Sequence, residues 1–438
     1  MHMSLKTNRT SLVVLLAMIC VNTVYSQMYF PPKTGTWDTL STNRFGYCSN
    51  RIDSLYQFLS ATNSKSFILL KDGKIVLEKY FGTFTKDSNW YWASAGKTLT
   101  AFCVGIAQQE GKLNIQDKTS KYLGNGWTNL SQSQEDSIKV WHQLTMTTGL
   151  DDNLGDRDCT LPSCLVYKDA PGNRWAYHNA PYTLLDKVIE AATSSTLNVF
   201  VYQKVANPIG MKGIYFKSGY NNVYGSDSRS MARFGLLLLN QGKWNGTSIM
   251  SDTNYFHQMT HSSQKLNLGY GLLTWLNGSK SFMLPQSQLV FPGSIAADAP
   301  TDAFMALGKN GQIINVVPSQ NLVWIRMGNP PGDNGSIPPL YNNDIWKYIN
   351  ALKCGTLSNS EIEEFAMNVF PNPVKQGNEL TFNSFEGHVP QIYNAAGQTI
   401  QVKCTLNHGK FTVQTQQLRP GVYFLRTLNQ SVKFVIID

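Results

Sequence analysis

A serine and a lysine stand three residues apart in Ser94-Ala95-Gly96-Lys97. Residues three apart share a face of a helix, so in a helical segment the Lys97 amine can reach the Ser94 hydroxyl. A serine hydroxyl is a weak nucleophile until a base takes its proton. An amine can act as that base when burial or nearby positive charge lowers its pKa. The spacing therefore predicts a nucleophilic serine activated by a lysine.

The same pattern occurs a second time, at Ser262-Ser263-Gln264-Lys265. This copy lies in polar sequence with no apolar helix behind it, and we interpret it as surface. Ser94 instead opens a stretch with apolar residues at helical spacing, which predicts a helix over 94–110 that Gly111 ends. The alternative is that Ser94 simply caps this helix.

A tyrosine and an asparagine flank a histidine in Tyr177-His178-Asn179. A tyrosine hydroxyl can move a proton, and an asparagine amide can orient a substrate carbonyl. His178 is a rival base, but in an extended segment its side chain points away from those of its neighbours. The alternative is a turn with a structural tyrosine.

A third motif, Lys309-Asn310-Gly311-Gln312, enters an apolar strand predicted over 313–317. Gly311 would let a substrate backbone approach the strand edge. The next N–H, on Gln312, is expected to face the Ser94 N–H and complete an oxyanion hole. Taken alone, the motif is also compatible with an ordinary hairpin turn.

The elements that would position these residues form one domain over 27–354. Asp72-Gly73, a tight-turn signal, joins strands over 67–70 and 75–80 into a hairpin. Helices and long loops follow, and strands return near the end of the domain. This order fits an α/β (α+β) fold, in which helices flank an antiparallel sheet and a helical subdomain is inserted. The clearest helices are 182–192 and 227–241, and the later strands are 270–276, 303–307, 313–317 and 322–327.

The remaining segments divide the chain further. Lys6 and Arg9 precede an apolar run over 12–21, which predicts a secretory signal over 1–26. Cys20 raises the alternative of a lipoprotein, but the bulky Ile19 precedes it. A polar linker follows the main domain over 355–366. Residues 367–438 show short alternating strands with frequent turn residues, which predicts a small β-sandwich.

The composition indicates a globular protein of more than one domain. The chain has 438 residues, of which 42% are hydrophobic and 15% charged, with a formal net charge of +9. No run of Lys or Arg concentrates this charge, so we expect a solvated basic surface and no nucleic-acid partner. No segment after the signal is long and apolar enough for a membrane helix, so the mature chain is expected to hold no integral membrane segment.

The cysteines suit an oxidising compartment. Cys159 and Cys164 lie close together in a polar loop and are expected to bridge. Cys48 begins one amphipathic stretch and Cys354 ends another, so antiparallel packing of the two would join the ends of the main domain. This connectivity is a hypothesis, because sequence alone does not fix it.

No cofactor is predicted. The chain contains no His-Glu-x-x-His and no paired Cys-x-x-Cys, and no glycine-rich phosphate loop stands out. Two further cysteines have no predicted partner: Cys103 on an apolar helical face and Cys404 near the C-terminus. One acidic loop lacks the spacing of a calcium loop, and we interpret it as solvated. Its members are Asp151, Asp152, Asp156 and Asp158.

Together and in this order, the three motifs resemble the penicillin-recognising serine hydrolases. This group contains class C β-lactamases, D-Ala-D-Ala carboxypeptidases, related esterases and 6-aminohexanoate-dimer hydrolases. The resemblance covers about residues 45–354. Other segments that carry it are Lys121-Tyr122-Leu123, Leu144-Thr145-Met146-Thr147-Thr148-Gly149-Leu150 and Gly242-Lys243-Trp244-Asn245-Gly246.

The resemblance implies a role for each motif residue. Ser94 would be the acylated nucleophile, Lys97 its partner and Tyr177 the shared general base and acid. Asn179 would contact the substrate amide, and Lys309 would hold the tyrosinate or a substrate carboxylate. The chain departs from the β-lactamase pattern because it has Lys-Asn-Gly in place of Lys-Thr-Gly. The missing hydroxyl would weaken carboxylate binding, so we do not expect an efficient β-lactamase.

The C-terminal segment resembles the sorting domain of the type IX secretion system. The segments that carry this resemblance are Val369-Phe370-Pro371-Asn372-Pro373, Ile392-Tyr393-Asn394-Ala395-Ala396-Gly397-Gln398, Leu418-Arg419-Pro420-Gly421-Val422-Tyr423 and Val432-Lys433-Phe434. The resemblance implies a Bacteroidetes-type bacterium and the type IX machinery as a partner. A carbohydrate-binding sandwich is the alternative, but the expected row of exposed aromatic residues is not evident.

These observations predict a secreted serine hydrolase that cleaves an ester or amide through a Ser94 acyl-enzyme. The substrate would be a small molecule or peptide: a β-lactam, a D-amino-acyl peptide or a small ester. The protein would pass through the periplasm to the cell surface or the medium. A catalytically silent, penicillin-binding-like sensor is the alternative.

Overall fold

The computed structural model describes residues 28–332, 338–354, 369–383, 391–395, 397–407, 410–426 and 431–438. The predicted signal over 1–26 and the predicted linker over 355–366 lie outside the described residues. The chain forms two compact units, residues 1–354 and residues 355–438. Each unit is described by itself.

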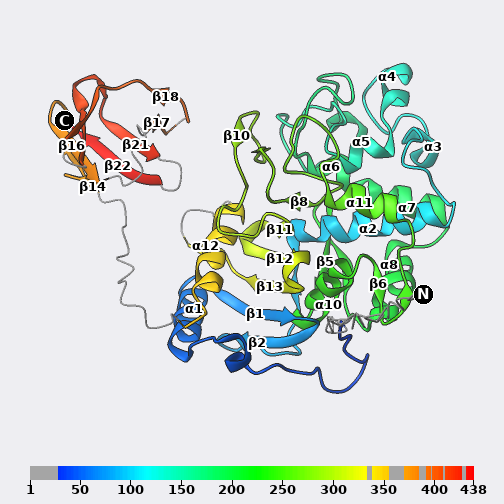
Figure 1. Ribbon diagram of the computed structural model, residues 1–438. Helices are drawn as coiled ribbons and strands as arrows, with labels where there is room; N and C mark the ends of the chain where they lie inside the picture. The colour runs from blue at the N-terminus through cyan, green and yellow to red at the C-terminus, as the bar shows by residue number, and fades with distance from the viewer. Residues whose placement is uncertain are drawn as a thin grey trace, which may run out of the picture. The chain divides into compact units, whose positions relative to one another are not determined.

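A six-stranded antiparallel sheet is the centre of the first unit (Figure 1). Its first hairpin turns at Asp72 and Gly73, whose φ values of 50° and 82° are left-handed, as the predicted tight turn requires. In spatial order the strands are β2 (Lys74–Tyr80), β1 (Ser64–Lys71), β13 (Leu322–Gly328), β12 (Gln312–Val317), β11 (Phe304–Gly308) and β8 (Trp275–Leu276).

Helices cover both faces of this sheet. Side chains of successive strand residues point to opposite faces, and β13 shows which helix lies on each. Val323 lies against Gly235 of α10 (Ser228–Leu239), whereas Trp324 packs edge-on against Trp346 of α12 (Pro338–Asn350). Helix α1 (Ser49–Ala61) packs beside α12, and α2 (Gly96–Gln109) packs against β11. The predicted α+β architecture is confirmed.

The segment between β2 and β8 holds the inserted helices and a small sheet. The strands of this sheet are β3 (Trp90–Tyr91), β5 (Asn221–Ser226) and β4 (Ile214–Ser218). None of them was predicted, and β3 is only two residues long. The inserted helices are α3 (Ser120–Leu123), α4 (Gln132–Ser137), α5 (Val140–Leu144), α6 (Asn179–Thr183), α7 (Leu185–Thr193), α8 (Leu197–Val201), α9 (Asn207–Ile209) and α11 (Thr253–Thr260).

Two predicted elements differ from the observed ones. The helix expected over 182–192 is divided between α6 and α7 at Leu184. The strand expected over 270–276 is reduced to β8. Its earlier part leaves the sheet because Leu273 has a φ of 49° and donates its N–H to the Leu144 carbonyl.

The two predicted disulfides are both present. Cys48 and Cys354 lie 5.2 Å apart at Cα, and the Cys354 N–H also bonds the Gly46 carbonyl. This bridge joins segments 306 residues apart. Cys159 and Cys164 close a short loop. Cys103 is a buried free thiol, as expected from its apolar helical face.

The second unit contains two sheets around one apolar core, as the alternating pattern predicted. The core draws on both sheets, with Leu380 and Phe411 from one and Leu425 and Phe434 from the other. One sheet has the order β14 (Val369–Phe370), β16 (Glu379–Asn383), β20 (Lys410–Gln414), β19 (Cys404–Asn407). The other has β15 (Val374–Lys375), β22 (Ser431–Ile437), β21 (Gly421–Arg426), β17 (Gln391–Asn394), β18 (Thr399–Ile400).

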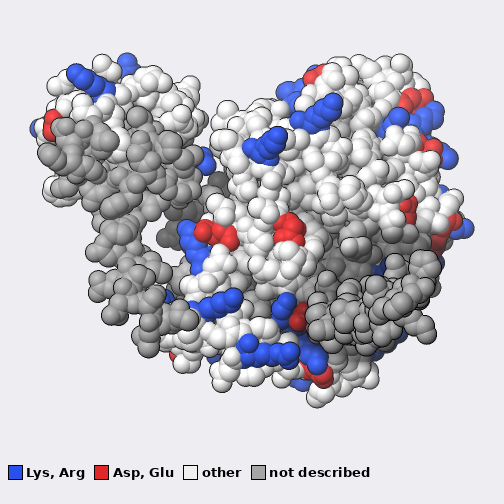
Figure 2. Space-filling model, viewed as in Figure 1, with Lys and Arg blue, Asp and Glu red and all other residues white. Residues whose placement is uncertain are grey.

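The surface charge is dispersed on the face that Figure 2 shows, where Lys and Arg alternate with Asp and Glu. This agrees with the absence of basic runs in the sequence. Within the described ranges, no helix has the length and apolar character needed to cross a membrane.

Candidate active site

Ser94 lies on a tight turn between β3 and α2. The turn is a short 3-10 helix, η2 (Ala93–Ala95), and Ala93 adopts a left-handed φ of 48° that non-glycine residues rarely adopt. Trp92 anchors it, because its buried indole donates to the Ser226 hydroxyl at 2.8 Å. The α-helix therefore begins at Gly96, two residues later than expected. Ser94 lies in a first helical turn, where N–H groups have no intrahelical acceptor.

Lys97 reaches Ser94 as the spacing predicted. Its amine donates to the Ser94 hydroxyl at 3.0 Å, and the side chain is only 3% exposed. The nitrogen also lies 4.1 Å from the ring centre of Tyr182 and 4.9 Å from that of Tyr177. Burial lowers the pKa of Lys97 to about 7, although Asp158 and Asp186 nearby oppose this shift. A substantial fraction of the amine is therefore neutral near pH 7.

Tyr177 stands beside the pair in an aromatic cluster. Its ring stacks on Trp275 at 5.8 Å between centres, and Tyr270 meets it edge-on at 6.3 Å. Burial raises the pKa of Tyr177, while a hydrogen bond with the Ser94 side chain partly opposes the rise. The phenol therefore keeps its proton near neutral pH. It can donate and relay a proton, but it is a poor resting base.

Asn179 begins α6 two residues after Tyr177. Its amide nitrogen donates to a carboxylate oxygen of Asp158 at 2.7 Å. Its amide oxygen is buried and has no partner among the described residues. His178 is also buried, and burial lowers the pKa of its ring to about 4. The imidazole is therefore neutral.

The third motif lies in the turn between β11 and β12. Gly308, just before it, touches the Ser94 turn: a Cβ on Gly308 would lie 2.4 Å from the Trp92 carbonyl oxygen and 2.9 Å from the Ala95 nitrogen. The Lys309 side chain is exposed, and Asn310 donates to the Tyr91 hydroxyl at 2.7 Å. The turn is thus close to Ser94 through its backbone.

The positions of Gly311 and Gln312 do not fit the roles predicted for them. Gly311 has a φ of 71°, and the space that its side chain would need is filled by Arg326 and Tyr341. Gln312 is fully buried, and its amide exchanges hydrogen bonds with the Gly328 backbone. Arg326 and Tyr341 therefore close one side of Gly311, and the Gln312 backbone is paired with Gly308 in the β11–β12 ladder.

The alternation of β11 indicates another N–H for the oxyanion hole. In an antiparallel ladder, the backbone groups of every second residue point to the same neighbour. Ala303 accepts the Asn277 N–H on the β8 side, so Leu307 and Lys309 present their N–H groups on that side too. The β8 ladder ends at Met305. The N–H of Lys309 therefore points to an edge that β8 leaves open, next to the Ser94 turn.

The acidic loop predicted as solvated is engaged with protein groups. Asp151 pairs with Lys168 at 3.0 Å, and Asp152 pairs with Arg174 at 2.6 Å. Asp156 accepts the Asp158 N–H at 2.9 Å. Several of these aspartates therefore make ion pairs or hydrogen bonds within the protein, which the composition of the loop did not indicate.

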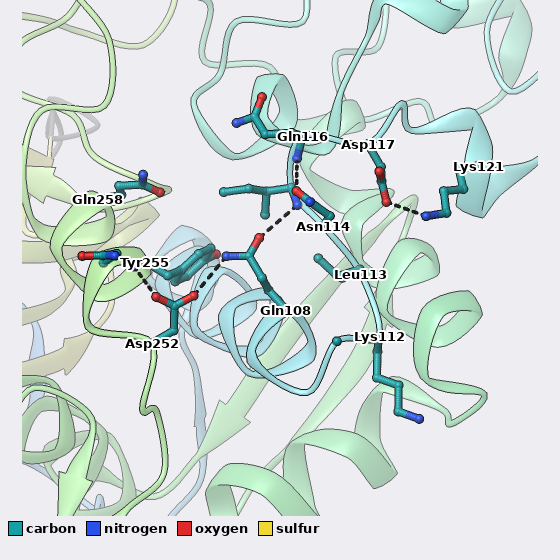
Figure 3. Close-up of a pocket in the computed structure, with 13 residues that line it drawn as sticks. Gln108, Lys112, Leu113, Asn114, Gln116, Asp117, Lys121, Asp252, Tyr255 and Gln258 are labelled. Atoms are coloured by element: carbon teal, nitrogen blue, oxygen red, sulfur yellow. Dashed lines mark hydrogen bonds and ion pairs between the residues drawn. The ribbon is translucent and has the colours of Figure 1, made fainter.

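A polar hollow of about 690 Å³ lies elsewhere, at the far end of α2. Figure 3 shows Gln108 between Asp252 and the turn that leads to Asp117, which pairs with Lys121. Ser94 does not line this hollow. The Ser94 turn, apart from this hollow, is the candidate active site.

Sequence reasoning did not single out Asp158 or Gly308, among other neighbours of the motif residues. Asp158 lies in a loop of several aspartates, and nothing in the spacing singles out the one that meets Asn179. Gly308 precedes the third motif, and the only available signal was a glycine ending an apolar strand. Trp92 and Trp175, which flank the motifs, belong to the buried core.

The fold and the Ser–Lys pair define the serine hydrolase class to which β-lactamases belong. Residues 53–338 match the Beta-lactamase family model, and the chain belongs to this family. Residues 368–437 match the secretion system C-terminal sorting domain. The resemblances stated for both units are confirmed.

Individual proteins are also similar to this chain. The Alkalihalophilus pseudofirmus protein BpOF4_21049 is 25% identical over 355 residues, or 71% of this chain and 98% of that protein. Protein flp of Staphylococcus aureus strain MW2 is 24% identical over 35% of this chain, which matches 34% of its length. A "putative 6-aminohexanoate-dimer hydrolase" structure from Bacillus anthracis superposes with a TM-score of 0.56 and 18% identity, over 75% of this chain and 91% of that one. The last likeness concerns the fold alone.

Proposed function

We propose that the protein is a secreted serine hydrolase that cleaves an ester or amide through a Ser94 acyl-enzyme. The observation that carries this proposal is the contact between Lys97 and Ser94. The amine lies 3.0 Å from the hydroxyl in a buried site, and burial lowers its pKa to about 7. A neutral amine at this distance can take the hydroxyl proton as the serine attacks.

In the proposed acylation, Lys97 takes the hydroxyl proton of Ser94 while the Ser94 oxygen forms a bond to the carbonyl carbon of the substrate. Tyr177 gives its proton to the leaving group as the bond to that group breaks, and Lys97 returns a proton to the tyrosine oxygen. A water molecule then attacks the ester by the reverse proton path. The structure favours Lys97 as the resting base, because the pKa of Tyr177 is raised.

The backbone N–H groups of Ser94 and of Lys309, in the third motif, are proposed to bind the developing oxyanion. The Ser94 N–H lies in a first helical turn, and the Lys309 N–H lies on the open side of β11. Such donors stabilise the charge that develops on the carbonyl oxygen. We propose Lys309 in place of Gln312 for this role.

The substrate is proposed to be a small ester or amide without an essential carboxylate. The Lys309 ammonium is exposed, and the Asn310 amide is bound to Tyr91. This turn offers neither the hydroxyl nor the inward cation that a β-lactam or peptide carboxylate would need. We therefore expect p-nitrophenyl esters to be cleaved faster than nitrocefin or D-Ala-D-Ala peptides.

The second unit is proposed to direct export. Its match to the sorting domain supports passage across the outer membrane by the type IX machinery, and the two disulfides suit an oxidising destination. The predicted signal over 1–26 would direct the earlier crossing of the inner membrane.

The test is intact-mass measurement after incubation with a fluorophosphonate, which phosphonylates activated serines. We expect one adduct on the wild type, and none on Ser94→Ala. Ser262→Ala, in the second Ser-x-x-Lys pattern, is the matched control and should label like the wild type. An unlabelled wild type would favour the silent sensor instead.

A further inference from the structure

Asp158 lies against the active site but belongs to none of its motifs. It accepts a hydrogen bond from the Asn179 amide nitrogen at 2.7 Å. An amide has one donor end and one acceptor end, so this bond fixes which way the group faces. The Asn179 oxygen is then left buried and without a partner among the described residues. A buried acceptor without a partner carries a free-energy cost, which an incoming N–H donor would relieve.

Covalent and backbone bonds hold Asp158 at this place. It directly precedes Cys159, whose bridge to Cys164 closes the loop. Its own N–H donates to Asp156 at 2.9 Å, and the neighbouring Arg157 carbonyl accepts the Ala180 N–H at 3.1 Å. The loop is thus bonded to the start of α6 by both a side chain and the backbone.

The same carboxylate lies within electrostatic range of the Lys97 amine. The other groups around Lys97 are Ser94, the rings of Tyr177 and Tyr182, and Asp186 from α7. Asp186 is only 2% exposed and bonds Asn222 at 2.7 Å. Burial raises the pKa of Asp186 to about 7, so its charge changes near neutral pH. Asp158 is less buried.

We propose that Asp158 is a positioning residue of the hydrolase. It holds the Asn179 amide with its oxygen free for an N–H donor of the substrate, and its negative charge stabilises the protonated form of Lys97. The inference rests on the proposed function, because both effects act through the Ser94 reaction.

The experiment measures two rates between pH 5 and 9 in the full chain. One is the hydrolysis of a p-nitrophenyl ester of an N-acyl amino acid, whose amide supplies the N–H donor, and the other is Ser94 labelling by a fluorophosphonate. Asp158→Asn keeps an acceptor oxygen for Asn179 but removes the charge, so the acid limb of both rates should move to lower pH with the plateau retained. Asp158→Ala removes both. The acid limb of this variant should move likewise. The plateau of its ester hydrolysis should fall at least about tenfold, because Asn179 is no longer held. Asp53→Asn, which removes a charge from an exposed position on α1, is the control and should change neither rate.

The proposal needs two results: an acid limb at lower pH in both variants, and a lower plateau in Asp158→Ala. The lack of either result overturns it. If Asp158→Ala does not fold, the limb of Asp158→Asn decides alone. The two failures are separable. An unlabelled wild type sinks the proposed function, whereas normal labelling with unchanged variants sinks only the role of Asp158.

Discussion

The Lys97 side chain combines a strong base with an apolar setting. Burial disfavours the ammonium, and this lowers the pKa of the amine to about 7. An exposed lysine on the same helix face would stay protonated and could take no proton from Ser94. The buried setting of Lys97 therefore acts on the chemistry through desolvation.

This setting predicts a pH profile. Only the neutral amine can accept the Ser94 proton, so the ester hydrolysis rate should fall about tenfold per pH unit below pH 7 and level off above it. Lys97→Arg should lose at least about a hundredfold at every pH, because a guanidinium stays protonated. The readout is kcat/KM for a p-nitrophenyl ester from pH 5 to 9. A wild-type limb near pH 10 would contradict this account of Lys97.

The proposed oxyanion donor predicts a backbone substitution. Lys309 begins the short 3-10 turn η5 (Lys309–Gly311) and follows Gly308, whose φ of −127° and ψ of 153° are extended. Proline is tolerated at the first position of a helical turn and favours an extended predecessor. Lys309→Pro removes the N–H together with the side-chain ammonium, and should lower kcat about 10²- to 10³-fold with little change in stability.

Lys309→Ala is the matched variant, since it keeps the N–H and removes the exposed ammonium. Near-wild-type hydrolysis by Lys309→Ala and loss by Lys309→Pro would support the backbone role. The reverse pattern would assign the effect to the side chain, as the Lys-Asn-Gly resemblance first implied.

At the scale of elements, the end of β11 and the Ser94 turn must approach closely. A Cβ on Gly308 would lie 2.4 Å from the Trp92 carbonyl oxygen, and backbone atoms cannot rotate away as a flexible side chain can. Gly308→Ala should push β11 from the turn, lowering kcat at least about tenfold because misplaced catalytic groups lose rate steeply. The φ of Gly308 suits alanine, so the effect would be steric.

Gly332→Ala is the control, because nothing lies within 4 Å of its added Cβ and its backbone is not left-handed. It should keep wild-type activity and melting temperature. Equal activity of Gly308→Ala and the wild type would show that the two elements do not need this approach.

The sequence predicted the elements whose signals are local. The Asp72-Gly73 hairpin and α10 with its Asp227 cap appear where expected, because a tight-turn pair and a capping residue act on their own neighbours. The Ser94–Lys97 contact is local in the same sense. The proposed oxyanion donor, Lys309, lies three residues before the predicted one, because its assignment depends on the ladder register of β11 with β8, which no local pattern encodes. The choice of Asp158 among four aspartates likewise depends on how a disulfide loop meets α6.

At the scale of the whole molecule, the two units have separate hydrophobic cores. The first has its own sheet, core and end-to-end disulfide, and the second has a separate core. All ten tryptophans precede residue 355. Tryptophan fluorescence therefore follows unfolding of the first unit in the intact chain, without a signal from the second unit.

This probe can measure what the buried base costs in stability. Folding lowers the pKa of Lys97 from 10.5 to about 7, so between these values the unfolded chain binds more protons than the folded one. The contribution of Lys97 to the free energy of unfolding must then rise with pH from about 7 to 10.5. Below pH 7 both states hold the proton, and the full penalty of a buried ammonium applies. That penalty should be on the order of a few kcal/mol.

Lys97→Met keeps the length of the side chain and removes its charge. We expect this inactive variant to be more stable than the wild type below pH 7, by several degrees in melting temperature. The difference should shrink as the pH rises and vanish near 10.5, because the wild-type amine is then neutral in both states. Lys112→Met, at an exposed site, should follow the wild-type curve. Parallel curves for Lys97→Met and the wild type would mean that Lys97 titrates alike in the folded and unfolded chain, which would remove its claim to be the base.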